Sequence, residues 1–120
     1  MRKKILIIED DPDILELLRI VFRESGHEVI FSPTELDTGH IQILHPDLIL
    51  LDVRLKGSAR SGFDICADLK ANPKTKMLPV ILCSGEHNLP EIARRCRADM
   101  YLIKPYNTVS LLSNVNKFLS

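Results

Sequence analysis

The sequence predicts an α/β protein, a single domain in which helices cover both faces of a parallel β-sheet. Short apolar runs, such as Ile5–Ile8 and Leu48–Leu51, alternate along the chain with amphipathic stretches. A short apolar run bounded by turn signals is typical of a strand buried on both faces, as in a parallel sheet. Strict alternation with short connections favours right-handed strand–helix–strand crossovers.

Five strands are expected, at residues 5–8, 28–31, 48–52, 80–83 and 100–103. Each is followed by a helical pattern, so five helices are expected as well. In the first helix, Asp11 is typical of an N-cap and Pro12 of the first helical position, and Ser25–Gly26 is expected to end it. Its apolar positions fall on one helical stripe, formed by Ile14, Leu17, Leu18, Val21 and Phe22.

The other helices are read from the same signals. Ser32 and Glu35 have the S-x-x-E spacing of a capping box, which predicts a second helix that begins there and closes before Pro46. A third helix follows Gly62 and is expected to stop at Asn72–Pro73, because the residue before proline disfavours helix. The fourth is expected over residues 90–97. The last carries apolar positions at Leu111, Leu112, Val115, Phe118 and Leu119.

The composition excludes several classes of protein. Sixteen basic residues balance sixteen acidic ones, so no net charge attracts nucleic acid, and a protein or small-molecule partner is expected. Apolar runs such as Leu48–Leu51 are far shorter than the roughly 18 residues of a membrane span. Cys66, Cys83 and Cys96 lack disulfide or zinc spacing, which favours a reducing, cytoplasmic location. We expect residues 1–120 to form one domain, with no effector domain in this chain.

Ionisable residues stand where the strands end. Glu9 and Asp10 follow the first strand, Asp52 ends the third and Lys104 follows the fifth. The carboxyl ends of parallel strands meet at one edge of the sheet, which is where ligands bind in open α/β folds. Ser84, after the fourth strand, adds a hydroxyl there.

The residue types at this edge indicate phosphoryl chemistry. Carboxylates about 4 Å apart repel by about 1 kcal/mol per pair in water and about 4 kcal/mol at an effective dielectric of 20, so a cluster of three favours a cation. Mg²⁺ suits hard oxygen ligands and completes its shell with water and phosphate oxygens. Lys104 and Ser84 add an ammonium and a hydroxyl for a phosphoryl group, leaving one carboxylate as the nucleophile. Asp11 and Asp13 are expected to stabilise the first helical turn instead.

With these residues in order, the whole chain resembles a response-regulator receiver domain of two-component signalling. The resemblance rests on the acidic pair Glu9–Asp10, Asp52, Ser84, Tyr101 and Lys104–Pro105. It implies a flavodoxin-like fold with strand order 2-1-3-4-5. Whether such a receiver stands alone or was cut from a larger protein is left open.

The resemblance also implies a role for each position. Asp52 resembles the phosphoacceptor, and Glu9 and Asp10 resemble the acidic pair that binds Mg²⁺ together with Asp52. The family's further protein ligand is a backbone carbonyl two residues past the phosphoacceptor, which here is Arg54. Lys104 resembles the lysine that binds the phosphoryl group.

A signalling switch, with no enzyme turnover, is the implied activity. Ser84 resembles the switch hydroxyl and Tyr101 the aromatic coupled to it. Phosphorylation by a histidine kinase or a histidine phosphotransfer protein is expected to change the surface of helix 4, strand 5 and helix 5, where a downstream protein binds. Polar residues replace the arginines that dimerising regulators of this family often carry on helix 5, so a monomer or weak dimer is expected, without direct nucleic-acid binding: Ser110, Ser113, Asn114 and Asn116.

Some features depart from the family pattern, and two other functions stay open. The loop from Asp52 to Gly62 is two residues longer than usual, and Lys56 stands where proline is common. Arg54 and Glu86 flank the site with opposite charges that could form a lid. A pseudo-receiver would keep the fold as a binding module without phosphorylation. A small magnesium phosphohydrolase is the other alternative, but no separate general acid or cap segment is evident.

Overall fold

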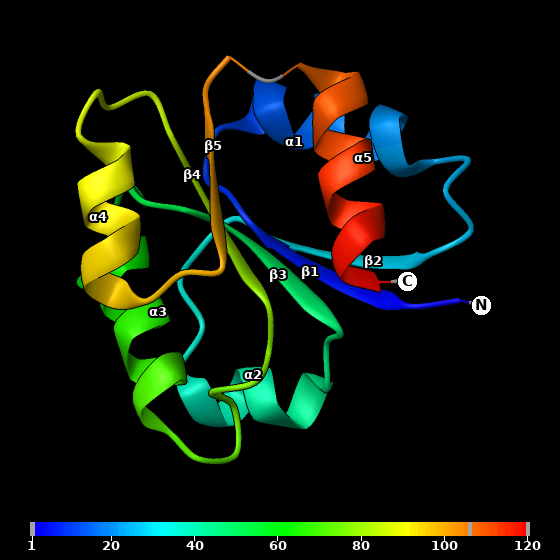
Figure 1. Cartoon of the computed structure of the whole chain (residues 1–120). Coiled ribbons are helices and arrows are strands. Elements are labelled where there is room, and N and C mark those ends of the chain that lie inside the picture. The colour runs from blue at the N-terminus through cyan, green and yellow to red at the C-terminus, as the bar shows by residue number, and fades with distance from the viewer. Residues whose placement is uncertain (1, 106, 120) are drawn as a thin grey trace.

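The computed structural model describes residues 2–105 and 107–119 and contains one parallel sheet with strand order β2-β1-β3-β4-β5 (Figure 1). The predicted alternation of strands and helices is confirmed. The elements are β1 (Lys4–Ile8), α1 (Pro12–Phe22), β2 (Glu28–Ser32), α2 (Thr38–Leu44), β3 (Leu48–Asp52), α3 (Gly62–Ala71), β4 (Val80–Ser84), α4 (Leu89–Cys96), β5 (Met100–Ile103) and α5 (Thr108–Leu119).

Helices cover both faces of the sheet and divide the core in two. One apolar cluster joins the sheet to α2, α3 and α4, through residues such as Ile41, Leu69 and Leu89. The other joins it to α1 and α5, through residues such as Leu18 and Leu111. Figure 1 shows α1 and α5 on one side and α2, α3 and α4 on the other. The central strands β3 and β4 are buried at every position, which explains their solid apolar character.

Strand register brings the carboxyl ends of the strands to one edge. Ile8 of β1 pairs with Ser32 of β2 and with Leu51 of β3. Asp52, the last residue of β3, pairs with Cys83, and Ser84 pairs with Ile103 of β5. The residues that follow these strands therefore emerge side by side.

The predicted start of the second helix is wrong. Ser32 is the last residue of β2, and its hydroxyl donates to the carbonyl of Thr34 at 2.7 Å instead of capping a helix. The helix begins six residues later, where the carboxylate of Asp37 accepts from the backbone N–H of His40 at 2.7 Å. Glu35 is not part of a capping box, because its carboxylate accepts from the backbone N–H of Ala59.

Other helix ends follow the sequence signals. The Asp11 carboxylate accepts from the backbone N–H groups of Asp13 and Ile14, which confirms it as the N-cap of α1. A capping box joins Ser61 and Asp64 at the start of α3 and was not predicted. It orients the helix that packs beside the end of β3.

A tight backbone contact at Gly62 gives a test of the fold. A Cβ at Gly62 would lie 2.1 Å from the carbonyl oxygen of Asp52, so Gly62→Ala forces the backbone around Asp52 to move. We expect a loss of about 2–3 kcal/mol in the free energy of unfolding, measured by urea titration.

Gly39→Ala is the matched control for this substitution. Gly39 lies inside α2, where the nearest atom to an added Cβ is a carboxylate oxygen of Asp37 at 3.5 Å. Since alanine is the better helix former, this variant should gain about 0.5–1 kcal/mol. Equal stability of the two variants would contradict the close packing of Gly62 on β3.

Candidate functional site

An open pocket of about 560 Å³ lies at the carboxyl edge of the sheet. Four strands supply its polar side chains. Glu9 and Asp10 follow β1, Asp52 ends β3, Ser84 ends β4 and Lys104 follows β5, and all five line the pocket. The structure thus brings together the ionisable residues that the sequence placed at strand ends.

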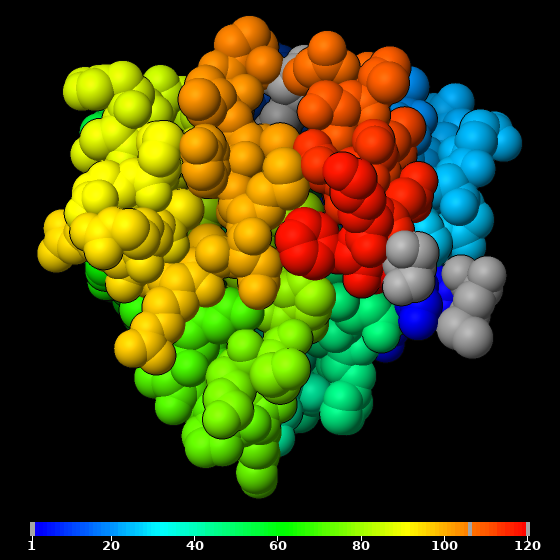
Figure 2. All heavy atoms as spheres, in the orientation of Figure 1, coloured from blue at the N-terminus to red at the C-terminus, as the bar shows by residue number. Residues whose placement is uncertain are grey.

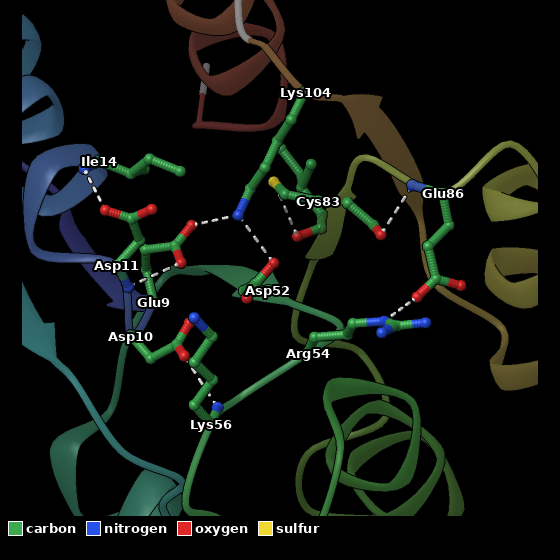
Figure 3. Close-up of polar contacts among 12 residues, drawn as sticks. Glu9, Asp10, Asp11, Ile14, Asp52, Arg54, Lys56, Cys83, Glu86 and Lys104 are labelled. Atoms are coloured by element: carbon green, nitrogen blue, oxygen red, sulfur yellow. Dashed lines mark hydrogen bonds and ion pairs between the residues drawn. The ribbon is translucent and has the colours of Figure 1, made fainter.

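Lys104 lies between two buried carboxylates (Figure 3). Its Nζ donates to Oδ1 of Asp52 at 2.9 Å and lies 2.7 Å from Oε1 of Glu9. Glu9 and Asp52 are 2% and 5% exposed, so the ammonium is the nearest compensation for charges that water barely reaches. Since one ammonium cannot balance two carboxylates, the centre of the pocket stays negative.

Burial and neighbouring charges shift the pKa values of this group. Burial raises the pKa of Asp52 to about 7, against the hydrogen bond from Lys104, and repulsion from Glu9 and Asp10 adds to the rise. Burial acts to lower the pKa of Lys104, but its contacts with Glu9 and Asp52 prevail and raise it above the ordinary value. The ammonium form of Lys104 is therefore favoured between these carboxylates.

Asp10 is held by the loop that follows β3. Its Oδ2 accepts from the backbone N–H of Lys56 at 2.8 Å. Partial burial would raise the pKa of Asp10, but this hydrogen bond and others prevail and lower it. Asp10 is thus favoured as a carboxylate, and the loop from β3 to α3 fixes its orientation.

The carboxylates fit a divalent cation. One oxygen each from Glu9, Asp10 and Asp52 lies within 4.8 Å of the others. Oε1 of Glu9 is buried without a well-oriented hydrogen bond among the described residues, although Lys104 pairs with it by charge. Three hard oxygen donors in an open pocket form a donor set suited to Mg²⁺. Asp11 also borders the pocket, but its carboxylate caps α1.

Of the remaining predicted residues, Ser84, Arg54 and Glu86 line the pocket and Tyr101 does not. Ser84 is buried, and its Oγ accepts from the backbone N–H of Glu86 at 3.1 Å. Glu86 in turn forms an ion pair with Arg54 at the mouth of the pocket, as the opposite charges suggested (Figure 3). Tyr101 does not line this pocket; it is 40% exposed on β5 and faces a separate hollow beside α4.

Two contributors were missed from the sequence. The main chain of Lys56 takes part through its N–H, for which no side-chain pattern exists. Glu35, assigned to a helix cap, contacts the same loop through Ala59. The one sequence feature that pointed to these contacts was the unusual length of the loop between Asp52 and Gly62, because a longer loop needs more contacts to hold it in place.

Comparison with known proteins identifies the class. The family model described as the response regulator receiver domain matches residues 5–116. The chain belongs to this family, and it is the receiver domain of a two-component response regulator.

Within residues 2–105 and 107–119, no helix has the length and apolar character needed to cross a membrane.

Individual relatives agree with this assignment. The DNA-binding response regulator MtrA of Mycolicibacterium smegmatis is 32% identical over 96% of this chain and 50% of its own length, so the chain spans about half of that relative. The receiver domain of NtrX from Brucella abortus is 28% identical, with a TM-score of 0.82 over 96% of this chain and 97% of that one. The signal receiver domain of a histidine kinase from Syntrophus aciditrophicus is 30% identical, with a TM-score of 0.82 over 98% and 89%.

The raised pKa of Asp52, caused mainly by burial, predicts how stability depends on pH. Folding raises the pKa of Asp52 from 3.8 to about 7, so the folded state binds its proton more tightly than the unfolded state. Wild-type stability is therefore lost as the pH rises from about 4 to about 7. Asp52→Asn removes this titration and should raise the free energy of unfolding of the metal-free protein by about 1–3 kcal/mol above pH 7.

Urea titrations at pH 4.5 and pH 8 in the presence of EDTA measure this effect. The gain should be small at pH 4.5 and full at pH 8. Asp68→Asn is the control, because Asp68 is an exposed acid on α3, far from the pocket and paired with Arg60. A gain from Asp52→Asn that is the same at both pH values would contradict the raised pKa of Asp52.

Proposed function

We propose that Asp52 accepts a phosphoryl group with the help of Mg²⁺, and that this chain is a phosphorylation-dependent switch. The observation that carries the proposal is the pocket itself, in which a buried carboxylate contacts an ammonium and lies beside two further carboxylates. The donors are a histidine kinase or a histidine phosphotransfer protein.

The proposed cation site consists of Glu9, Asp10, Asp52 and the backbone carbonyl of Arg54. No donor among residues 2–105 and 107–119 hydrogen-bonds to that carbonyl, which leaves its lone pairs available. Mg²⁺ bound there would offset the negative charge of the carboxylates and of the phosphoryl oxygens.

The reaction follows from the contacts of Asp52. A carboxylate oxygen of Asp52 attacks phosphorus, the bond from phosphorus to the imidazole nitrogen of the donor breaks, and that nitrogen keeps the electron pair. Lys104, which already contacts Asp52, would stabilise the oxygens of the transferred group. Ser84 lies at the end of the neighbouring strand and can donate its hydroxyl hydrogen to the same group. Hydrolysis, in which water takes the phosphoryl group and the Asp52 carboxylate is restored, would end the signal. The domain would thus assist both its own phosphorylation and its own dephosphorylation.

The proposed output surface is formed by α4, β5 and α5. Figure 2 shows β5 exposed between these two helices. Among the described residues, apolar side chains are exposed there at Tyr101, Ile103 and Val109. A phosphoryl group adds about −1.5 to −2 charges beside Ser84, whose loop leads into α4. A downstream protein would bind this surface. The domain would act in the cytoplasm as a monomer or weak dimer, without direct contact to nucleic acid.

Intact-mass measurement tests the phosphoryl transfer. Incubation with Mg²⁺ and acetyl phosphate should add one phosphate per chain, and Asp52→Asn should abolish the adduct. Omission of Mg²⁺ should slow its formation at least tenfold, because the metal supplies much of the charge compensation. Absence of any adduct on the folded protein would favour a pseudo-receiver, and rapid multiple turnover of acetyl phosphate without a stable adduct would favour a phosphohydrolase.

NMR tests the change of the output surface. Beryllofluoride, which mimics a phosphoryl group, should shift the amide signals of α4, β5 and α5 in the presence of Mg²⁺. The amide signals of α2, none of whose residues lines the pocket, serve as the internal reference. Unchanged shifts of β5 and α4 would refute this part of the proposal even if Asp52 is phosphorylated.

A further inference from the structure

Hydrogen bonds hold the loop between β3 and α3 on two sides. Its backbone N–H at Lys56 donates to Asp10 at 2.8 Å, on the side of the acidic pocket. The chain turns at residues 55–58, where the N–H of Ser58 donates to the carbonyl of Leu55. Gly57 in this turn has a positive φ of 75°. The turn thereby aims the Lys56 N–H at the pocket.

Glu35 holds the outer side of the same loop. Its Oε1 accepts from the backbone N–H of Ala59 at 3.1 Å, and its own N–H donates to the hydroxyl of Ser58 at 3.3 Å. These two contacts connect the segment between β2 and α2 to a part of the chain more than 20 residues away. The contact with Ser58 is partly buried, whereas the contact with Ala59 is exposed.

The Glu35 contacts extend to the pocket through the backbone. The same loop carries Arg54, which borders the pocket, and Lys56, whose N–H orients Asp10. Groups that orient a ligand from outside commonly alter metal affinity when they are removed. A shift of the Ser58–Ala59 turn would move the Lys56 N–H and so release the Asp10 carboxylate.

We propose that Glu35 is a positioning residue for the cation site, which it supports by bracing the loop from residue 54 to residue 60 through hydrogen bonds to Ser58 and Ala59. The effect on metal binding rests on the proposed function. The support of the loop by Glu35 rests only on the hydrogen bonds. Glu35 touches neither the metal nor the reacting atoms. Its effect is on how well the carboxylate of Asp10 and the carbonyl of Arg54 are oriented before the cation binds.

The test compares three variants of the whole chain. Glu35→Ala removes the acceptor for the Ala59 N–H, and we expect the Kd for Mg²⁺, measured by calorimetry, to rise about tenfold. Glu35→Gln keeps an oxygen that accepts the same hydrogen bond, and its Kd should stay within about threefold of the wild type. Glu24→Ala removes an exposed acid after α1 and should leave the Kd unchanged.

The pattern of results separates positioning from charge. Equal weakening in Glu35→Ala and Glu35→Gln would overturn the proposal, because it would show that Glu35 acts through its charge alone. A Kd in Glu35→Ala equal to that of the wild type would also overturn it. Urea titration of each variant checks that the affinities are those of folded protein.

A metal-free measurement keeps the inference independent of the proposed function. Hydrogen exchange at the Lys56 amide, followed by NMR without Mg²⁺, should be at least threefold faster in Glu35→Ala than in the wild type, while exchange at Leu50 in β3 stays the same. Unchanged exchange at Lys56 would overturn the brace. If the wild type binds no Mg²⁺ at all, the proposed metal function fails, and the exchange rates alone decide whether Glu35 holds the loop.

Discussion

The charge contacts of Lys104 with Glu9 and Asp52 hold the functional edge of the sheet together. One ammonium lies 2.7 Å and 2.9 Å from two carboxylates that water barely reaches. These contacts link the ends of β1, β3 and β5, which are not all neighbours in the sheet. Removing Lys104 would leave two buried carboxylates without compensation, so the arrangement of Glu9 and Asp52 depends on this one ammonium. The rest of the domain is the scaffold that holds them at this separation.

The apolar strands and the charged ends specify the register jointly. In β3 and β4 every residue is buried, so alternation of apolar and polar positions cannot distinguish one register from the next. The abrupt change from apolar to charged residues supplies the missing information. Sliding β1 inward by one residue would carry Glu9 into the apolar layer, and sliding it outward would expose Ile8. The residues that form the pocket therefore also fix the position of the strands that carry them.

The sequence predicted what depends on local pattern and missed what depends on distant partners. The strand ends beside Asp52 and Lys104 were predictable because apolar runs mark buried strands, whereas the strand order was predicted from the resemblance to receiver domains. The start of α2 was not, because Ser32 and Glu35 have capping-box spacing while Glu35 is engaged by Ala59, 24 residues away. The actual capping box at Ser61 has the same kind of spacing. Spacing alone cannot tell which candidate is free of competing tertiary contacts.

The negative charge that destabilises the metal-free pocket would also make the pocket respond to phosphorylation. A phosphoryl group on Asp52 would replace one carboxylate charge with a larger one, at the place where Lys104 is already shared with Glu9. The added charge would attract Arg54 and repel Glu86, which now form an ion pair at the mouth of the pocket. Glu86 is also tied to Ser84 through its backbone N–H. Any separation of this pair therefore pulls on the segment between β4 and α4, which gives the charge change a direct path to the α4 surface.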